Sequence, residues 1–146
     1  MSLDRVLVLN GPNLNRLGTR QPEIYGTATL DDLRASLQHH AGDVEIDLRQ
    51  SNDEAELIGW LHEAVDARVP VILNPAAFTH YSYALRDAAT LVTEAGVPLI
   101  EVHLSNPHAR EEFRHTSVIS AVATGVIAGF GADSYALALQ QILRSA

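Results

Sequence analysis

Two ionisable side chains, Glu101 and His103, stand two positions apart in an apolar stretch that is typical of a strand. Because side chains alternate across a strand, both point to the same face. A carboxylate that holds one ring nitrogen of a histidine fixes its tautomer and favours the charged ring, which can then act as a general acid. The same spacing suits a purely structural ion pair, and the pattern alone does not choose between the two interpretations.

A long polar segment after the first apolar strand is the second place where chemistry is expected. It carries asparagines close to the strand, among them Asn13, and further along Arg20 and Tyr25. Loops of this length are uncommon in small domains and tend to be lids or binding loops. A guanidinium beside a phenol favours the phenolate, which is a usable base. The alternatives are turn chemistry for the asparagines and a surface position for Arg20 and Tyr25.

Further polar residues follow other predicted strands. Asn74 and the pair Ser105–Asn106 stand where backbone donors and a helix N-terminus can hold an anion. Arg110 and Arg114 are four residues apart, and surface ion pairs with neighbouring glutamates are the simpler interpretation for both. The histidines outside the strand end show no recognised zinc spacing, so we expect no metal site.

Composition excludes several classes of chemistry. The chain has a net charge of −8, no cysteine and no lysine. Nucleic acid and anionic membranes need a basic face, and the ten arginines are scattered, so neither is an expected partner. Without cysteine or lysine there is no thiol nucleophile and no Schiff base. No basic segment precedes an apolar run at the start and no run approaches about 20 apolar residues, so we expect a cytoplasmic protein.

The elements that must position these residues alternate along the chain. Apolar periodicity and capping signals predict one domain, residues 1–146, with a parallel sheet. Capping boxes are expected at 29–32 and 51–54, and Tyr135 lies on the apolar stripe of the last helix. The predicted strands are 6–9, 44–49 (at a sheet edge), 69–74, 96–103 and 126–130; helices follow the two boxes, begin near Thr79, run from Pro107 to about Arg114, and close the chain.

Strands joined by single helices imply right-handed crossovers, so the leading fold is α/β: a flavodoxin-like, doubly wound five-stranded parallel sheet with helices on both faces. Ligands bind beyond the carboxyl ends of the strands in that architecture. The pair Glu101 and His103 lies at such an end, and the long polar segment that carries Asn13, Arg20 and Tyr25 follows another.

Several ordered motifs are spread from the first strand to the last helix. They are residues 10–14 (NGPNL), 20–26 (RQPEIYG), 50–52 (QSN), 100–106 (IEVHLSN), 108–111 (HARE) and 125–127 (GVI). Together they resemble the type II 3-dehydroquinate dehydratases of the shikimate pathway and its quinate-degrading relative. The resemblance implies a single catalytic domain that reversibly dehydrates 3-dehydroquinate to 3-dehydroshikimate without metal or cofactor.

The resemblance also implies a role for each matching residue. Tyr25 would remove a proton beside the ketone, with Arg20 favouring its ionised form and stabilising the transition state. Asn13 would hold the enolate oxygen through a water. His103, oriented by Glu101, would protonate the departing hydroxyl.

The same resemblance implies how the small anionic substrate is bound. Asn74 and the backbone at Leu104 and Ser105 would receive its carboxylate. The family forms dodecamers built from trimers, so a homo-oligomer is expected in which one binding residue reaches a neighbouring subunit's site. The side chains expected at the ring hydroxyls are His80, Arg114 and Asp87, the last of these being the one that reaches across.

The sequence departs from the family's usual pattern at four positions. Ala76 stands where the family has a glycine, which bears on the local backbone. Tyr81 and Tyr83 are bulkier than usual in a segment expected near a subunit contact. Gln21 replaces a common glutamate close to Arg20 and removes a charge there.

Two other classes of function compete with the enzyme. A flavodoxin-like module for a flavin or mononucleotide needs a phosphate cradle rich in Ser, Thr and Gly, which the first loop lacks. A receiver-like regulatory domain needs an acidic cluster and a lysine, whereas this chain has Asn10 and Asn74 at the corresponding strand ends.

Overall fold

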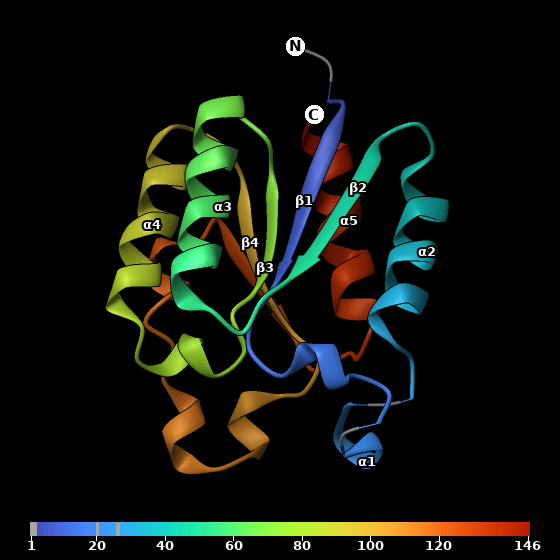
Figure 1. Cartoon of the computed structure of the whole chain (residues 1–146), viewed down its shortest axis with the longest axis vertical. Helices are drawn as coiled ribbons and strands as arrows, with labels where there is room; N and C mark the ends of the chain where they lie inside the picture. The colour runs from blue at the N-terminus through green and yellow to red at the C-terminus, as the bar shows by residue number, and fades with distance from the viewer. Residues whose placement is uncertain (1–2, 20, 26) are drawn as a thin grey trace.

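The computed structural model describes residues 3–19, 21–25 and 27–146, without the side chain of Tyr25. Five parallel strands form one sheet in the order β2-β1-β3-β4-β5 (Figure 1). The predicted doubly wound α/β fold is therefore confirmed, including the edge position of the second strand. The strands are β1 (Arg5–Asn10), β2 (Glu45–Gln50), β3 (Val71–Asn74), β4 (Leu99–His103) and β5 (Gly125–Ala128).

Helices cover both faces of the sheet, with α3 and α4 on one side and α2 and α5 on the other (Figure 1). Strand β1 shows the alternation that supports both layers. Val6 and Val8 pack in the core with α2 and α5, whereas Leu7 and Leu9 pack in the core with α3 and α4. The α-helices are α1 (Pro22–Tyr25), α2 (Leu30–Ala41), α3 (Glu54–Ala67), α4 (Tyr83–Glu94) and α5 (Asp133–Ser145).

Among the described residues, four of the five short 3-10 helices lie beyond the carboxyl ends of the strands, at the lower end of the view in Figure 1, whereas the fifth precedes β5. One of the four, η1, and the four-residue α-helix α1 lie in the first loop, where no helix is predicted because elements this short show no periodicity. The 3-10 helices are η1 (Leu14–Arg16), η2 (Ala76–His80), η3 (Pro107–Ala109), η4 (Glu112–His115) and η5 (Ser120–Val122).

Helix α4 begins at Tyr83, four residues later than predicted. Its N-cap is Ser82, whose hydroxyl accepts a hydrogen bond from Leu85 N at 3.0 Å. Thr79 lies instead in η2, and the backbone of Tyr81 leaves the helical region (φ −153°). The prediction was wrong because a hydroxyl residue at position 79 looked like a helix start, while Ser82 supplies the actual cap.

Two other helix predictions were wrong in detail. The expected capping box at 51–54 is absent, since Asp53 caps α3 by accepting from Ala55 N, and Ser51 Oγ accepts from Asp53 N at 2.9 Å. The helix expected from Pro107 to Arg114 is two 3-10 helices, because the backbone at Arg110 between them is extended. The capping box at 29–32 is confirmed, with Thr29 and Asp32 bonding reciprocally.

The last predicted strand ends at Ala128 rather than at residue 130. Gly129 follows with φ 95°, a left-handed conformation that glycine adopts readily, and its N–H donates to His103 O at 3.2 Å. Within the described part of the chain, no helix combines the length and apolar content that a membrane crossing requires.

Candidate active site

A cavity of about 180 Å³ lies where the loops after β1, β3 and β4 meet, with η4 forming a further wall. This is the edge of the sheet at which ligands bind in doubly wound folds. The cavity brings together most of the site residues that the sequence predicted. Those that line it are Asn13, Asn74, His80, His103, Leu104, Ser105 and Arg114.

His103 and Glu101 form a close pair at the end of β4. The ring nitrogen Nε2 of His103 lies 2.5 Å from Glu101 Oε2, and the Glu101 side chain is only 1% exposed. An ionised carboxylate can only accept hydrogen bonds, so Nε2 carries a hydrogen and Nδ1 is the ring atom left to exchange a proton with a bound molecule. The predicted pairing is confirmed, and its place on the cavity wall favours an acid–base role over a purely structural one.

Glu101 has two partners that the sequence did not indicate. Ser120 Oγ donates to Glu101 Oε1 at 2.7 Å, and Ser117 Oγ lies 3.2 Å from each carboxylate oxygen. Both serines come from the segment before β5, in which no secondary structure was predicted. A pair of serines three residues apart has no distinctive pattern, so only the fold reveals them.

Asn74 is the last residue of β3 and is held by a buried polar network. Its Nδ2 donates to the hydroxyl of Tyr135 at 2.8 Å, and that hydroxyl donates to Asn10 Oδ1 at 2.7 Å. The Asn74 Oδ1 accepts from Ala76 N at 3.1 Å. Tyr135 was predicted only as part of the apolar stripe of the last helix, and its hydroxyl fixes the amide that faces the cavity.

Ala76 has φ 52°, in the left-handed region that favours glycine. The expectation that a residue other than glycine affects the local backbone here therefore has a structural basis. The hydrogen bond from Ala76 N to Asn74 Oδ1 is nevertheless formed, so the Asn74 side chain is still held at the cavity.

Hydrogen bonds from Gly11 and Asn13 hold the start of the first loop against the end of β3 and the segment that follows β2. Gly11 N donates to Asn74 O at 2.8 Å, and a Cβ at Gly11 would lie 2.6 Å from Pro75 O, so only glycine allows this approach. Asn13 N donates to Asn52 Oδ1 at 2.9 Å, which leaves the side chain of Asn13 at the cavity wall. The motif at 50–52 thus serves to anchor the loop.

His80 enters the cavity from η2. Its Nδ1 lies 2.8 Å from Thr116 O, and because a carbonyl oxygen accepts, Nδ1 carries the hydrogen. Burial lowers the pKa of His80, an effect larger than the opposing contribution of its bond to Thr116. The neutral ring then presents Nε2 as a hydrogen-bond acceptor for a ligand hydroxyl.

Arg110 and Arg114 make polar contacts with neighbouring residues and also line the cavity. Arg114 Nε donates to Glu111 Oε1 at 3.0 Å, and Arg110 Nη1 donates to Ser105 Oγ at 3.3 Å. Both side chains also line the cavity, so they bring positive charge to a site on an acidic protein. Arg110 was not predicted as a site residue, and its four-residue spacing from Arg114 was the one available signal.

Four predicted site residues are not placed in the lining of this cavity, and one of them, Glu101, is buried against His103. Asp87 lies exposed on α4 and does not line the cavity of its own chain. Arg20 and the side chain of Tyr25 lie outside the described residues.

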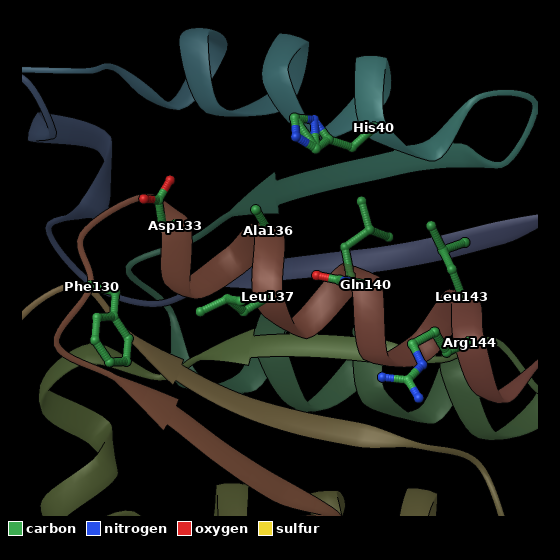
Figure 2. A pocket seen from close by; sticks show the side chains of 9 residues that line it. His40, Phe130, Asp133, Ala136, Leu137, Gln140, Leu143 and Arg144 are labelled. Atoms are coloured by element: carbon green, nitrogen blue, oxygen red, sulfur yellow. The ribbon is translucent and has the colours of Figure 1, made fainter.

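A larger hollow of about 520 Å³ runs along α5, below His40 of α2 (Figure 2). Its lining is mostly apolar and includes Leu137 and Leu143, with the ring of Phe130 at one end and Arg144 at the other. None of the predicted site residues lies in it, so the smaller polar cavity is the candidate active site.

The site combines a histidine held by a buried carboxylate with fixed amides and two arginines around a small polar cavity. In an α/β fold this arrangement is typical of enzymes that perform acid–base chemistry on small anionic molecules. Residues 4–143 match the family model described as dehydroquinase class II. The chain belongs to this class II dehydroquinase family.

Individual relatives agree with the family match over nearly the whole chain. The 3-dehydroquinate dehydratase of Salinispora tropica is 60% identical over 140 residues, covering 94% of this chain and 96% of the relative. The crystal structure of a type II dehydroquinase from Propionibacterium acnes superposes with a TM-score of 0.90 at 50% identity, covering 97% of this chain and 98% of that one. A type II dehydroquinase from Butyrivibrio crossotus gives 0.91 at 40% identity, covering 97% and 99%. This family membership replaces the two competing classes, the flavin module and the receiver-like domain.

Proposed function

We propose that the chain, acting as a single catalytic domain, is a hydro-lyase that reversibly dehydrates 3-dehydroquinate to 3-dehydroshikimate through an enolate. The observation that carries the proposal is the His103–Glu101 pair, 2.5 Å apart, on the wall of a small cavity at the strand ends. Family membership supplies the substrate, and this pair supplies a group suited to protonating the departing hydroxyl.

The acid step is the departure of a hydroxyl group, which leaves poorly unless it is protonated. His103 gives a proton to that oxygen, the carbon–oxygen bond breaks, and water departs. The electrons of the enolate then form the new carbon–carbon double bond conjugated with the ketone. The Glu101 carboxylate stabilises the charged ring before transfer and keeps Nε2–H directed away from the substrate.

The enolate arises when a base removes the proton next to the ketone. We assign this base to Tyr25 as the phenolate, with Arg20 stabilising its charge and that of the transition state. Asn13, whose backbone is anchored to Asn52, is the donor to the developing enolate oxygen, acting through a water. An acid and a base of this kind each contribute about 10²- to 10⁴-fold in rate.

Substrate binding uses the remaining cavity residues. The carboxylate is assigned to Asn74 and to the backbone of Leu104 and Ser105, and ring hydroxyls are assigned to His80 and Arg114. A hydroxyl that donates to Nε2 of neutral His80 is consistent with the bond between Nδ1 and Thr116 O. Local positive groups of this kind attract an anion despite the net charge of −8.

We further propose a cytoplasmic homo-oligomer, a dodecamer built from trimers, in which Asp87 of one subunit contacts the ring hydroxyls in the next. The exposed position of Asp87 on α4 supports this assignment, as do the exposed rings of Tyr81 and Tyr83 nearby. Light scattering on the purified protein tests the assembly, and a monomer at working concentration would contradict it.

The activity is tested by mixing the purified protein with 3-dehydroquinate and following the ultraviolet absorbance of the conjugated enone product without added metal. We expect the signal to rise. Its absence at every pH would defeat the proposal.

The roles are tested with variants in the same assay. Tyr25→Phe should abolish turnover while substrate still binds, and His103→Ala should lose turnover by a factor of about 10² to 10⁴. Glu101→Gln should be less severe. His62→Ala, on the exposed side of α3, is the matched control and should keep the parent rate. A Tyr25→Phe variant that retains most of the rate would remove Tyr25 as the base.

A further inference from the structure

The Glu101 carboxylate is buried, and three donors among the described residues converge on its two oxygens. Oε2 receives His103 Nε2, Oε1 receives Ser120 Oγ, and Ser117 Oγ lies equally close to both oxygens. The last torsion of a glutamate side chain is broad, so the backbone of β4 does not by itself fix the plane of the carboxylate. Donors on the side opposite His103 are therefore needed to fix it.

The direction of the Ser117 hydroxyl is determined by its other partners. Its oxygen accepts hydrogen bonds from the backbone N–H groups of Ile119 and Ser120, at 3.1 and 3.0 Å. These two donors occupy the acceptor positions of the hydroxyl, which leaves its own hydrogen for Glu101. Ser117 is thereby a donor of fixed direction.

The segment that carries both serines is itself held firmly. Val118 N donates to Thr79 O at 2.8 Å, and Arg86 Nη1 donates to Val118 O at 2.9 Å. Ile119 is fully buried in the core beside α3 and α4. The serine positions are thus set by hydrogen bonds to η2 and α4 and by the core packing of Ile119.

We propose that Ser117 and Ser120 are positioning residues, which hold the Glu101 carboxylate in the plane that fixes the Nε2–H tautomer and orientation of the His103 ring. The inference rests on the proposed function, because the acid step is where this orientation matters. Neither serine lines the catalytic cavity; both line an adjoining hollow of about 260 Å³ that also includes Glu101 and His103. Their hydroxyls are directed at Glu101, so we assign their effect to that carboxylate.

Ser120→Ala is the cleaner variant, because the Ser120 hydroxyl serves Glu101 whereas that of Ser117 also supports a turn. Loss of one hydrogen bond to a charged group should lower kcat about 10- to 100-fold, with KM within about twofold of the parent. Ser120→Thr keeps the hydroxyl and should recover most of the rate. Ser36→Ala, exposed on α2, is the matched control and should not change kcat. A kcat within twofold of the parent in Ser120→Ala overturns the inference.

A second measurement reads the ring directly and does not depend on turnover. In protein labelled with ¹⁵N-histidine, at a pH where the ring is neutral, the His103 signal should report Nε2–H in the parent. Its assignment comes from its absence in His103→Gln. In Ser120→Ala the signal should move towards the average of the two tautomers, and in Ser36→Ala it should not. A ring signal that stays unchanged in Ser120→Ala overturns the inference, even if kcat falls.

The two measurements separate this inference from the proposed function. A parent protein without turnover, whose ring signal still moves in Ser120→Ala, would defeat the function and support the positioning role. Normal turnover of the parent, with no change of kcat or of the His103 signal in Ser120→Ala, would support the proposed function and overturn the positioning role. If Ser120→Ala does not fold, Ser120→Cys replaces it, since a thiol is a weaker donor, with the same direction of change expected in both readouts.

Discussion

Removing the hydroxyl of Tyr135 should destabilise the protein far more than the loss of a single atom suggests. Tyr135 and Asn10 are fully buried and Asn74 is 3% exposed, and the phenol oxygen bonds to both amides at 2.7 and 2.8 Å. In Tyr135→Phe the Asn10 Oδ1 loses its donor in a dry interior, at a cost of about 1–3 kcal/mol. Asn74 faces the cavity, where water can reach its amide, so its loss is about 1 kcal/mol. The sum is about 2–4 kcal/mol.

Equilibrium urea unfolding at one fixed protein concentration measures this difference, because oligomer stability depends on concentration. The midpoint should fall by roughly 1–2 M with little change in the slope m. Tyr83→Phe removes the same atom from a ring that is 70% exposed and should stay within about 0.5 kcal/mol of the parent. Equal midpoints for the two variants would refute the view that this network stabilises the fold.

Three more outcomes are expected from the same structure. Ala76→Gly should raise the melting temperature by about 2–4 °C because Ala76 has φ 52°, whereas Ala77→Gly should lower it; a lower value for Ala76→Gly would contradict the strain argument. Burial lowers the pKa of His80, so in an NMR pH series its ring should titrate below the ordinary histidine value. Its contribution to stability is therefore present above about pH 6.5 and is lost as the pH falls. Titration at or above the ordinary histidine value would contradict this. Burial raises the pKa of Tyr135, so its stabilisation is present below about pH 10 and declines at higher pH, and chemical unfolding of Tyr135→Phe across that range should show a shallower decline; an unchanged decline would count against it.

The sheet and its order of elements could be predicted because each strand and long helix carries its own local pattern. Val6 to Leu9 form an unbroken apolar run because both faces of β1 are covered, and β2 alternates because it lies at an edge. The pairing of Glu101 with His103 followed from strand alternation alone. These are relations between residues a few positions apart, which sequence patterns express directly.

The supporting contacts of the site could not be predicted in this way. Tyr135 and Asn10 are 125 residues apart, and Ser120 is 19 residues from Glu101, so no local spacing connects them. The start of α4 was misplaced for a related reason, since a 3-10 turn at the strand exit is too short to leave a periodic pattern. The sequence predicted most of the side chains that line the cavity, whereas the hydroxyls that hold Asn74 and Glu101 were revealed by the fold.

The contact between Tyr135 and the ends of β1 and β3 also bears on how the protein is made. Synthesis proceeds from the N-terminus, so Asn10 and Asn74 emerge long before the helix that satisfies their amides. A nascent chain that has released β1 to β5 but not α5 contains the sheet and most of the cavity walls, yet two buried amides lack the phenol between them. Such a chain also leaves Val6 and Val8 without half of their covering layer. Docking of α5 is therefore the step that supplies the hydrogen bonds of Asn10 and Asn74, so these two amides are satisfied only after synthesis has passed Tyr135.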